Sequence, residues 1–206
     1  MTVRRQIAMV LLVAALGCST RPGKLHPPQV DAAAAADAAL AELDGDGDDR
    51  LAKGEWSKSA ALAAVAEQYD SNKDATLDGV EIRNGITVWQ ENAIGPRPVP
   101  FSVQLDNRPL AGATVRLVPA SFMADSIPGA AAETGEGGGG SLAMAEEDRP
   151  KNAPNMPLVQ PGLYRIEITH PSKTIPAKYN TQTTLGIEIT SGNPGPQGVV
   201  WSLSSK

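Results

Sequence analysis

The stretch "ELDGDGDDRLAKGEW", residues 42–56, carries the strongest pattern in the chain. Five carboxylates fall between Asp44 and Glu55, and acidic residues alternate with others at its start. Like charges packed this closely repel one another, so water or a cation must offset them. We therefore ask what these side chains surround.

The same pattern occurs a second time, 26 residues further along the chain. "LDGDGDDRLAKGEW" (43–56) aligns with "YDSNKDATLDGVEI" (69–82), so that oxygen-bearing side chains stand at positions 1, 3, 5 and 12 of both copies. Acidic helix caps are the alternative explanation for a single copy. Two copies with matching apolar flanks favour a duplicated ion-binding loop.

These two segments resemble the EF-hand, whose twelve-residue loop binds Ca²⁺ through six to eight oxygens. In that family position 7 supplies a backbone carbonyl, position 9 often acts through a water, and the glutamate at position 12 binds with both oxygens. Mg²⁺ needs fewer protein ligands and is the lesser candidate. The resemblance predicts these ligands: Asp44, Asp46, Asp48, Arg50 and Glu55 in the first copy, and Asp70, Asn72, Asp74, Thr76, Asp78 and Glu81 in the second.

Two further features of the loops are expected from the resemblance. Leu51 and Leu77 occupy position 8, where paired loops form a short β-contact and bury an aliphatic side chain. Position 6 needs a positive φ and usually carries glycine. Asp49 tolerates that conformation, whereas Ala75 costs about 1–2 kcal/mol, so we expect the second loop to bind more weakly.

The fold class predicted for the chain is α+β. Residues 31–94 are expected to form the helical EF-hand pair, because apolar residues recur at helical spacing in segments such as Leu62 to Tyr69 and Ile82 to Trp89. "GPRPVP" (95–100) has three prolines in six positions and is the best candidate for a domain boundary.

Residues 98–206 are expected to form an antiparallel β-sandwich. Apolar and polar residues alternate on either side of the turn "DNRP", and again near residues 163–168, 183–189 and 199–204. "PLAGATV" (109–115) and "PGLYRIEI" (161–168) resemble the carboxypeptidase regulatory-like, or transthyretin-like, domain. Residues near 120–160, which include "GEGGGG", lack periodicity and are predicted to be a flexible loop.

The first residues indicate export. Arg4 and Arg5 precede a short apolar run, which is typical of a secretory signal over residues 1–17. "ALGC" resembles the lipobox of bacterial lipoproteins, which implies lipidation of Cys18, the chain's one cysteine. An ordinary signal peptide with a leftover thiol is the alternative. Residues 18–30 are read as a tether, and the expected location is the cell envelope, at the outer membrane or the periplasmic face.

No motif in the sequence indicates an enzyme, and no catalytic residue is predicted. His26 and His170 do not make a zinc site, which needs three or four convergent ligands, and the acidic mature chain argues against nucleic acid as a partner. The predicted function is a calcium-binding, membrane-tethered lipoprotein with a binding or structural sandwich. An accessory domain that docks an envelope enzyme or transporter is the alternative.

Overall fold

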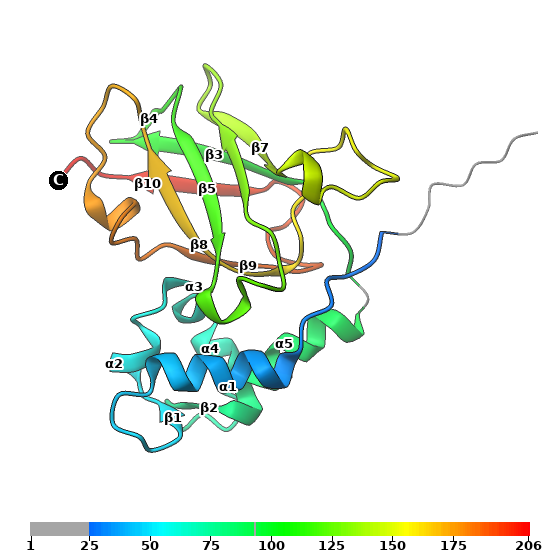
Figure 1. Ribbon diagram of the computed structural model, residues 1–206. Coiled ribbons are helices and arrows are strands. Elements are labelled where there is room, and N and C mark those ends of the chain that lie inside the picture. The colour runs from blue at the N-terminus through cyan, green and yellow to red at the C-terminus, as the bar shows by residue number, and fades with distance from the viewer. Residues whose placement is uncertain (1–24, 93) are drawn as a thin grey trace, which may run out of the picture.

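The computed structural model describes residues 25–92 and 94–206, so the predicted signal and Cys18 lie outside the described residues. Helices occupy one side of the molecule and a large curled sheet the other (Figure 1). The α+β class is thus confirmed at the level of a helical part and a mostly antiparallel sheet. Among the described residues, no helix has the length and apolar character to cross a membrane.

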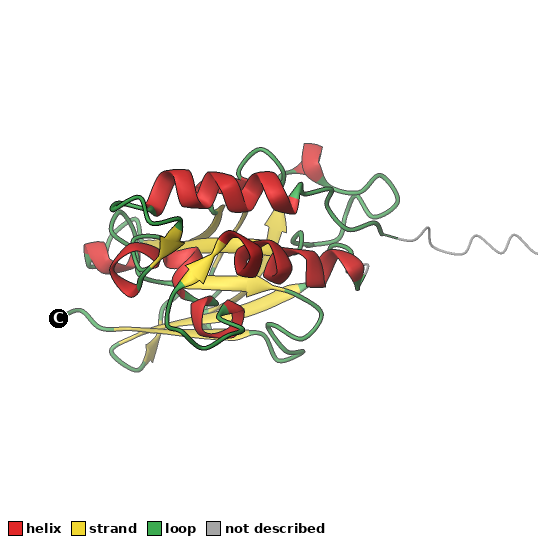
Figure 2. Ribbon diagram, turned by 90° about the horizontal axis from the view of Figure 1, so that it is seen from below, coloured by secondary structure: helices red, strands yellow, loops and turns green. Residues whose placement is uncertain are grey.

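The helical part contains five helices and a two-stranded sheet. Its longest helices, α1 (Ala32–Leu43) and α5 (Gly79–Glu91), pack against each other, and both lie in front of the strands when the molecule is seen from below (Figure 2). The shorter elements are β1 (Arg50–Leu51), α2 (Lys53–Trp56), α3 (Ala60–Ala63), α4 (Ala66–Tyr69) and β2 (Leu77–Asp78).

Each of the two long helices packs through one face of buried side chains. Small side chains on α1 bring it close to its neighbours, and the buried face of α5 is made by the large side chains of Ile82, Ile86 and Trp89. These three residues are at most 1% exposed. The helical spacing predicted for this segment is therefore confirmed.

The large sheet has eight strands in the order β10-β3-β7-β6-β5-β8-β9, with β4 paired to β3. All its pairs are antiparallel except β10 with β3, which is parallel. The strands are β3 (Val99–Leu105), β4 (Arg108–Pro109), β5 (Thr114–Pro119), β6 (Ala130–Glu133), β7 (Gly139–Met144), β8 (Gly162–Thr169), β9 (Gly186–Ile189) and β10 (Val199–Leu203). Single 3-10 turns lie at η1 (Ser121–Met123), η2 (Glu146–Asp148) and η3 (Ala177–Tyr179).

The prediction of a flexible loop near residues 120–160 is wrong for the middle of that range. β6 and β7 fall within residues 120–160 and pair with each other near the centre of the sheet. The glycines of this segment serve the packing there: a Cβ at Gly140 would lie 2.7 Å from the Phe101 ring. Small residues thus let neighbouring strands carry large side chains, a pattern that alternation of apolar residues does not reveal.

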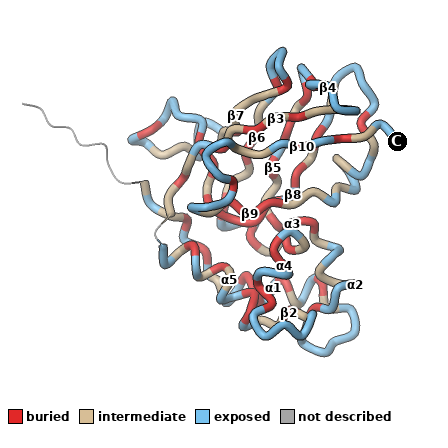
Figure 3. Tube along the Cα trace, turned by 180° about the vertical axis from the view of Figure 1, so that it is seen from behind, coloured by how far each residue is buried: buried red, intermediate tan, exposed pale blue. Residues whose placement is uncertain are grey.

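One continuous core joins the two parts of the molecule. Buried segments gather where α3 lies beside β8 and β9 (Figure 3). One close approach is at Gly186 of β9, where a Cβ would collide with the Ala60 backbone of α3. A second link is the Ser121 hydroxyl, which donates to Glu42 of α1 over 2.7 Å.

Residues 25–30, the end of the predicted tether, lie against the folded part. Val30 is 6% exposed within the core, and its carbonyl accepts a hydrogen bond from the Gln90 side chain. Leu25 packs on a small cluster that contains Met144 and Leu158. The end of the predicted tether is therefore packed on the folded part.

Candidate metal centre

Two acidic loops lie side by side at the end of the helical part. Loop 1 (residues 44–55) follows α1, and loop 2 (residues 70–81) joins α4 to α5. The strands β1 and β2 hold the loops together, with Leu51 opposite Leu77 and both at most 1% exposed. The β-contact predicted between these two leucines is therefore confirmed.

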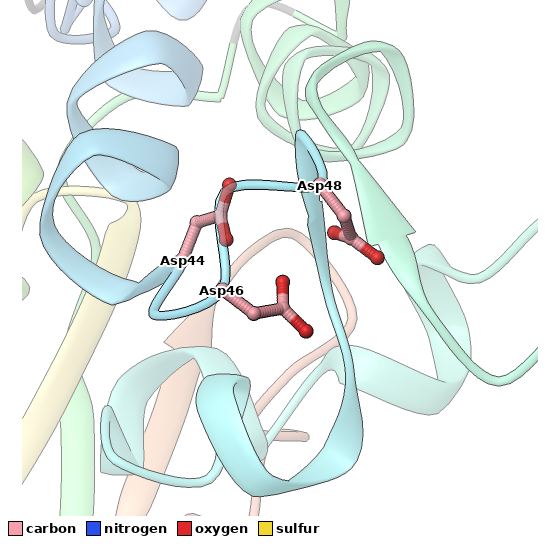
Figure 4. Close-up of side chains that lie close together, drawn as sticks. All are labelled: Asp44, Asp46 and Asp48. Carbon is pink, nitrogen blue, oxygen red and sulfur yellow. The ribbon is translucent and has the colours of Figure 1, made fainter.

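In loop 1 the aspartates at positions 1, 3 and 5 converge. One oxygen from each of Asp44, Asp46 and Asp48 lies within 4.8 Å of the others, and the three carboxylates gather inside the turn of the loop (Figure 4). Alternate residues of the tight turn face inward, which is why the spacing of two residues brings these groups together. All three remain open to solvent to some degree.

Backbone N–H groups orient Asp44. Its two oxygens accept hydrogen bonds from the N–H of Gly47 over 2.7 Å and of Asp49 over 3.0 Å. The Gly47 N–H is the main cause that lowers the pKa of Asp44. This carboxylate is therefore ionised at neutral pH.

Asp46 shows the opposite effect. The neighbouring charge of Asp48, with smaller contributions from burial and from Glu55, raises the pKa of Asp46. Repulsion among the acids of loop 1 is thus only partly offset by the backbone. A bound cation would offset this repulsion and favour the ionised carboxylates.

The glutamates at position 12 differ between the loops. Glu55 accepts from the N–H of Gly45 over 2.6 Å and of Ala52 over 2.9 Å, and the Gly45 N–H is the main cause that lowers its pKa. It lies beside the three aspartates without belonging to their cluster. Glu81 does belong to the cluster of its own loop.

Loop 2 brings together Asp70, Asp74 and Glu81, with one oxygen of each within 4.8 Å of the others. Glu81 is 5% exposed, and one of its oxygens accepts from the N–H and the hydroxyl of Ser71 over 2.9 and 3.1 Å. Asp70 accepts from the N–H of Asp74 and of Ala75. Each loop therefore bends its own backbone around its first aspartate.

Asp74 links the two loops. It accepts from the Thr76 hydroxyl over 2.6 Å and from the Arg50 guanidinium over 2.7 Å. The Thr76 hydroxyl, followed by the Thr76 N–H, lowers the pKa of Asp74 to about 2, and Arg50 acts in the same direction. The sequence predicted a role for the Arg50 backbone carbonyl and missed this side-chain contact between the loops.

The other predicted ligands have local partners. The Asn72 amide donates to Asp74 over 3.1 Å, and its oxygen accepts from the Asp74 N–H. Asp78, predicted at position 9, uses a carboxylate oxygen to accept from the N–H of Val80 and of Glu81 at 2.9 Å each. It thereby caps the start of α5.

The backbone of both loops turns at positions 4 and 6. Position 6 has φ of 62° at Asp49 and 67° at Ala75, so the positive φ predicted there is confirmed. At position 4, loop 1 has Gly47 with φ of 78°, whereas loop 2 has Lys73 with φ of 61°. Loop 2 thus holds two residues without the freedom of glycine in the left-handed region.

The donor set of both loops is made of oxygen, and carboxylates dominate it. Hard divalent cations prefer such a set. Comparisons of the chain with protein-family models, with curated proteins and with solved structures find no match. What the site does must therefore be argued from its geometry and charge.

Proposed function

We propose that the protein binds Ca²⁺ in loops 1 and 2, which act as an EF-hand pair. The observation that carries this proposal is the repeated convergence of acidic oxygens, from Asp44, Asp46 and Asp48 in one loop and from Asp70, Asp74 and Glu81 in the other. The β-contact between Leu51 and Leu77 supports it, since it holds the loops as a pair.

The preference for Ca²⁺ over Mg²⁺ follows from the number of protein oxygens offered. Mg²⁺ keeps several waters and takes one or two carboxylates, whereas Ca²⁺ takes six to eight oxygens in a flexible arrangement. Each loop offers three converging carboxylates, with further oxygens at positions 7 and 12 of loop 1 and at positions 3 and 7 of loop 2. We expect dissociation constants on the order of 10⁻⁴–10⁻³ M, as in extracellular modules.

The wider role proposed is that of a lipid-anchored protein of the cell envelope. Lipidation of Cys18 would hold the chain at a membrane surface, and the sheet, which we propose is a carboxypeptidase regulatory-like sandwich, would serve as a binding or structural module. Calcium would then stiffen the helical part against the sheet, because the two share one core.

Calorimetric titration of the chain carrying Cys18→Ser with CaCl₂ tests the proposal. Two binding steps are expected in the starting protein. Asp44→Ala should remove the tighter step and Asp70→Ala the weaker one, since loop 2 holds Lys73 and Ala75 at positive φ. Asp125→Ala, which removes one exposed carboxylate far from both loops in the sequence, is the matched control and should leave both steps unchanged.

Two results would contradict the proposal. One is a titration without heat at millimolar calcium, and the other is equal binding by Asp44→Ala, Asp70→Ala and the starting protein. A greater loss of the tighter step from Asp70→Ala would instead reverse the proposed order of the loops. Circular dichroism with and without a chelator checks the ordering, with higher helix content expected in calcium.

A further inference from the structure

A cavity of about 300 Å³ lies beside α5 and β9, next to loop 2. This volume is at the lower end of the range found for small-molecule sites. The residues on which its chemistry depends are Tyr69, Glu81, Val88, Trp89, Glu188 and Thr190. None of the residues that line it is a lysine, arginine or histidine.

Glu188 of β9 is a buried carboxyl group at this cavity. It is 3% exposed, and one of its oxygens accepts a hydrogen bond from the Tyr69 hydroxyl over 2.7 Å. Within the described part of the chain, the ion pairs found are Arg50 with Asp74 and Arg165 with Glu167. Glu188 therefore has no cationic partner there, and burial raises its pKa.

Trp89 also lines the cavity and carries a buried indole N–H. It is 1% exposed, and its indole N–H has no hydrogen-bond partner among the described residues. The indole N–H acts to lower the pKa of Tyr69, against the larger effect of burial, which raises it. Such a group gains free energy when a ligand supplies an acceptor.

We propose that this cavity binds a small organic ammonium ion that also carries a hydroxyl group, the chemistry of an amino alcohol. The ammonium would lie against Glu188 and supply the missing positive charge, and the hydroxyl oxygen would accept from the Trp89 N–H. Aromatic side chains of Trp89 and Tyr69 in the wall suit a cation as well. Ser71 and Glu81 of loop 2 also line this cavity, so the proposed ligand site adjoins the second calcium loop.

Choline is the probe, and 3,3-dimethylbutan-1-ol is its neutral counterpart, since a carbon replaces the nitrogen in an otherwise equal skeleton. Titration is followed by NMR of the indole N–H resonances of ¹⁵N-labelled protein. The chain has three tryptophans, so Trp56 and Trp201 serve as internal references. Two titrations are run in parallel. One contains calcium, to keep loop 2 ion-bound, and the other contains a chelator, to keep loop 2 ion-free.

We expect choline to shift the Trp89 resonance in a saturable way and to leave the other two in place. The neutral alcohol should bind at least about tenfold more weakly, because it offers Glu188 no charge. Glu188→Gln keeps an acceptor for the Tyr69 hydroxyl and removes the charge. It should reduce the preference for choline over the alcohol to less than about twofold.

A second pair of variants tests the site without touching the core. Val88 and Val80 both lie on α5 at 55% and 51% exposure, but only Val88 lines the cavity. Val88→Lys puts an ammonium at the cavity and should weaken choline binding at least about tenfold, whereas Val80→Lys adds the same charge and should change it less than about twofold.

Three results would overturn the proposal: no saturable shift of Trp89 by choline, equal binding of choline and the neutral alcohol, or equal loss from Val88→Lys and Val80→Lys. If Glu188→Gln fails to fold, the two lysine variants decide the question. Calcium binding by the same samples is measured separately, so failure at the cavity and failure at the loops are distinguished.

Discussion

Backbone conformation at single residues separates the two acidic loops. Loop 1 meets its two left-handed positions with Gly47 and Asp49, which tolerate them, whereas loop 2 uses Lys73 and Ala75. Conformational strain therefore falls on loop 2. Because this strain opposes the ion-binding conformation, we expect loop 2 to bind an ion more weakly than loop 1.

Ala75→Gly should relieve this strain. We expect unfolding free energy to rise by about 1 kcal/mol, because glycine adopts the left-handed conformation without a steric cost while gaining some freedom in the unfolded chain. Urea denaturation measures this, and calcium titration should show a tighter second step. Asp49→Gly is the control and should gain less, and a loss of stability in Ala75→Gly would contradict the assignment of strain.

Because the carboxyl group of Glu188 is buried, we expect the stability of the protein to depend on pH. Burial raises its pKa above 4.5, so the folded state binds its proton more tightly than the unfolded state does. The stability contributed by this group is complete below pH 4.5 and is lost as the pH rises through the higher folded-state value. Relative to Glu188→Gln, the starting protein should thus lose stability over that window in urea unfolding, and parallel profiles would contradict the prediction.

At the scale of residues, the sequence predicted the oxygen-bearing side chains of the loops and the positive φ at position 6. It did not predict the hydrogen bond between Arg50 and Asp74 or the one between Tyr69 and Glu188. Both contacts join segments far apart in the chain, so they depend on how the two loops pair and where β9 packs. A spacing pattern within one segment contains no information on either.

At the scale of elements, one aspartate of loop 2 also caps the start of α5. Asp78 caps the helix through two backbone N–H groups, and the helix in turn places Glu81 within the acidic cluster. Asp31 caps α1 in the same way, through the N–H of Ala33 and Ala34, and lies outside both loops. The two caps therefore form a natural comparison.

Asp78→Ala and Asp31→Ala should each lower the unfolding free energy by about 0.5–2 kcal/mol, the usual value of a helix cap. Only Asp78→Ala should also weaken calcium binding, because it loosens the turn of α5 that carries Glu81. Chemical denaturation and calorimetry measure the two effects. Equal calcium binding by both variants would show that the cap is not coupled to the loop.

Strand prediction succeeded where one face of a strand is buried and the other is not. β8 follows this rule, with apolar and polar residues alternating along Ile166, Glu167 and Ile168. β6 and β7 are built largely from alanine and glycine, and their place in the sheet is set by the large side chains of neighbouring strands. Their sequence alone does not alternate clearly enough to be read as strands.

At the scale of the whole molecule, the helical part and the sheet are not independent units. α3 packs directly on β9 because Gly186 has no side chain, and the core runs without a break between them. The proline-rich segment 95–100 suggested a boundary, and the chain does change there from helix to strand. The packing across that boundary depends on contacts that the sequence did not reveal.

Gly186→Ala should therefore destabilise both parts together. Its methyl group would overlap the Ala60 backbone, and overpacking of this kind costs about 1–3 kcal/mol. Gly192→Ala is the control, since a Cβ there meets no heavy atom within 4 Å, and it should change stability by less than about 0.5 kcal/mol. Urea unfolding followed by both circular dichroism and tryptophan fluorescence checks the expectation, and similar effects of the two variants would contradict it.

The parallel pairing of β10 with β3 has a consequence for how the chain matures. Among the described residues, β3 is the first strand of the large sheet along the chain, and its outer neighbour is the last one, β10 (Val199–Leu203). Until those residues leave the ribosome, one side of β3 has no strand beside it. A nascent chain stalled before Val199 would therefore present that open edge to chaperones or to other chains.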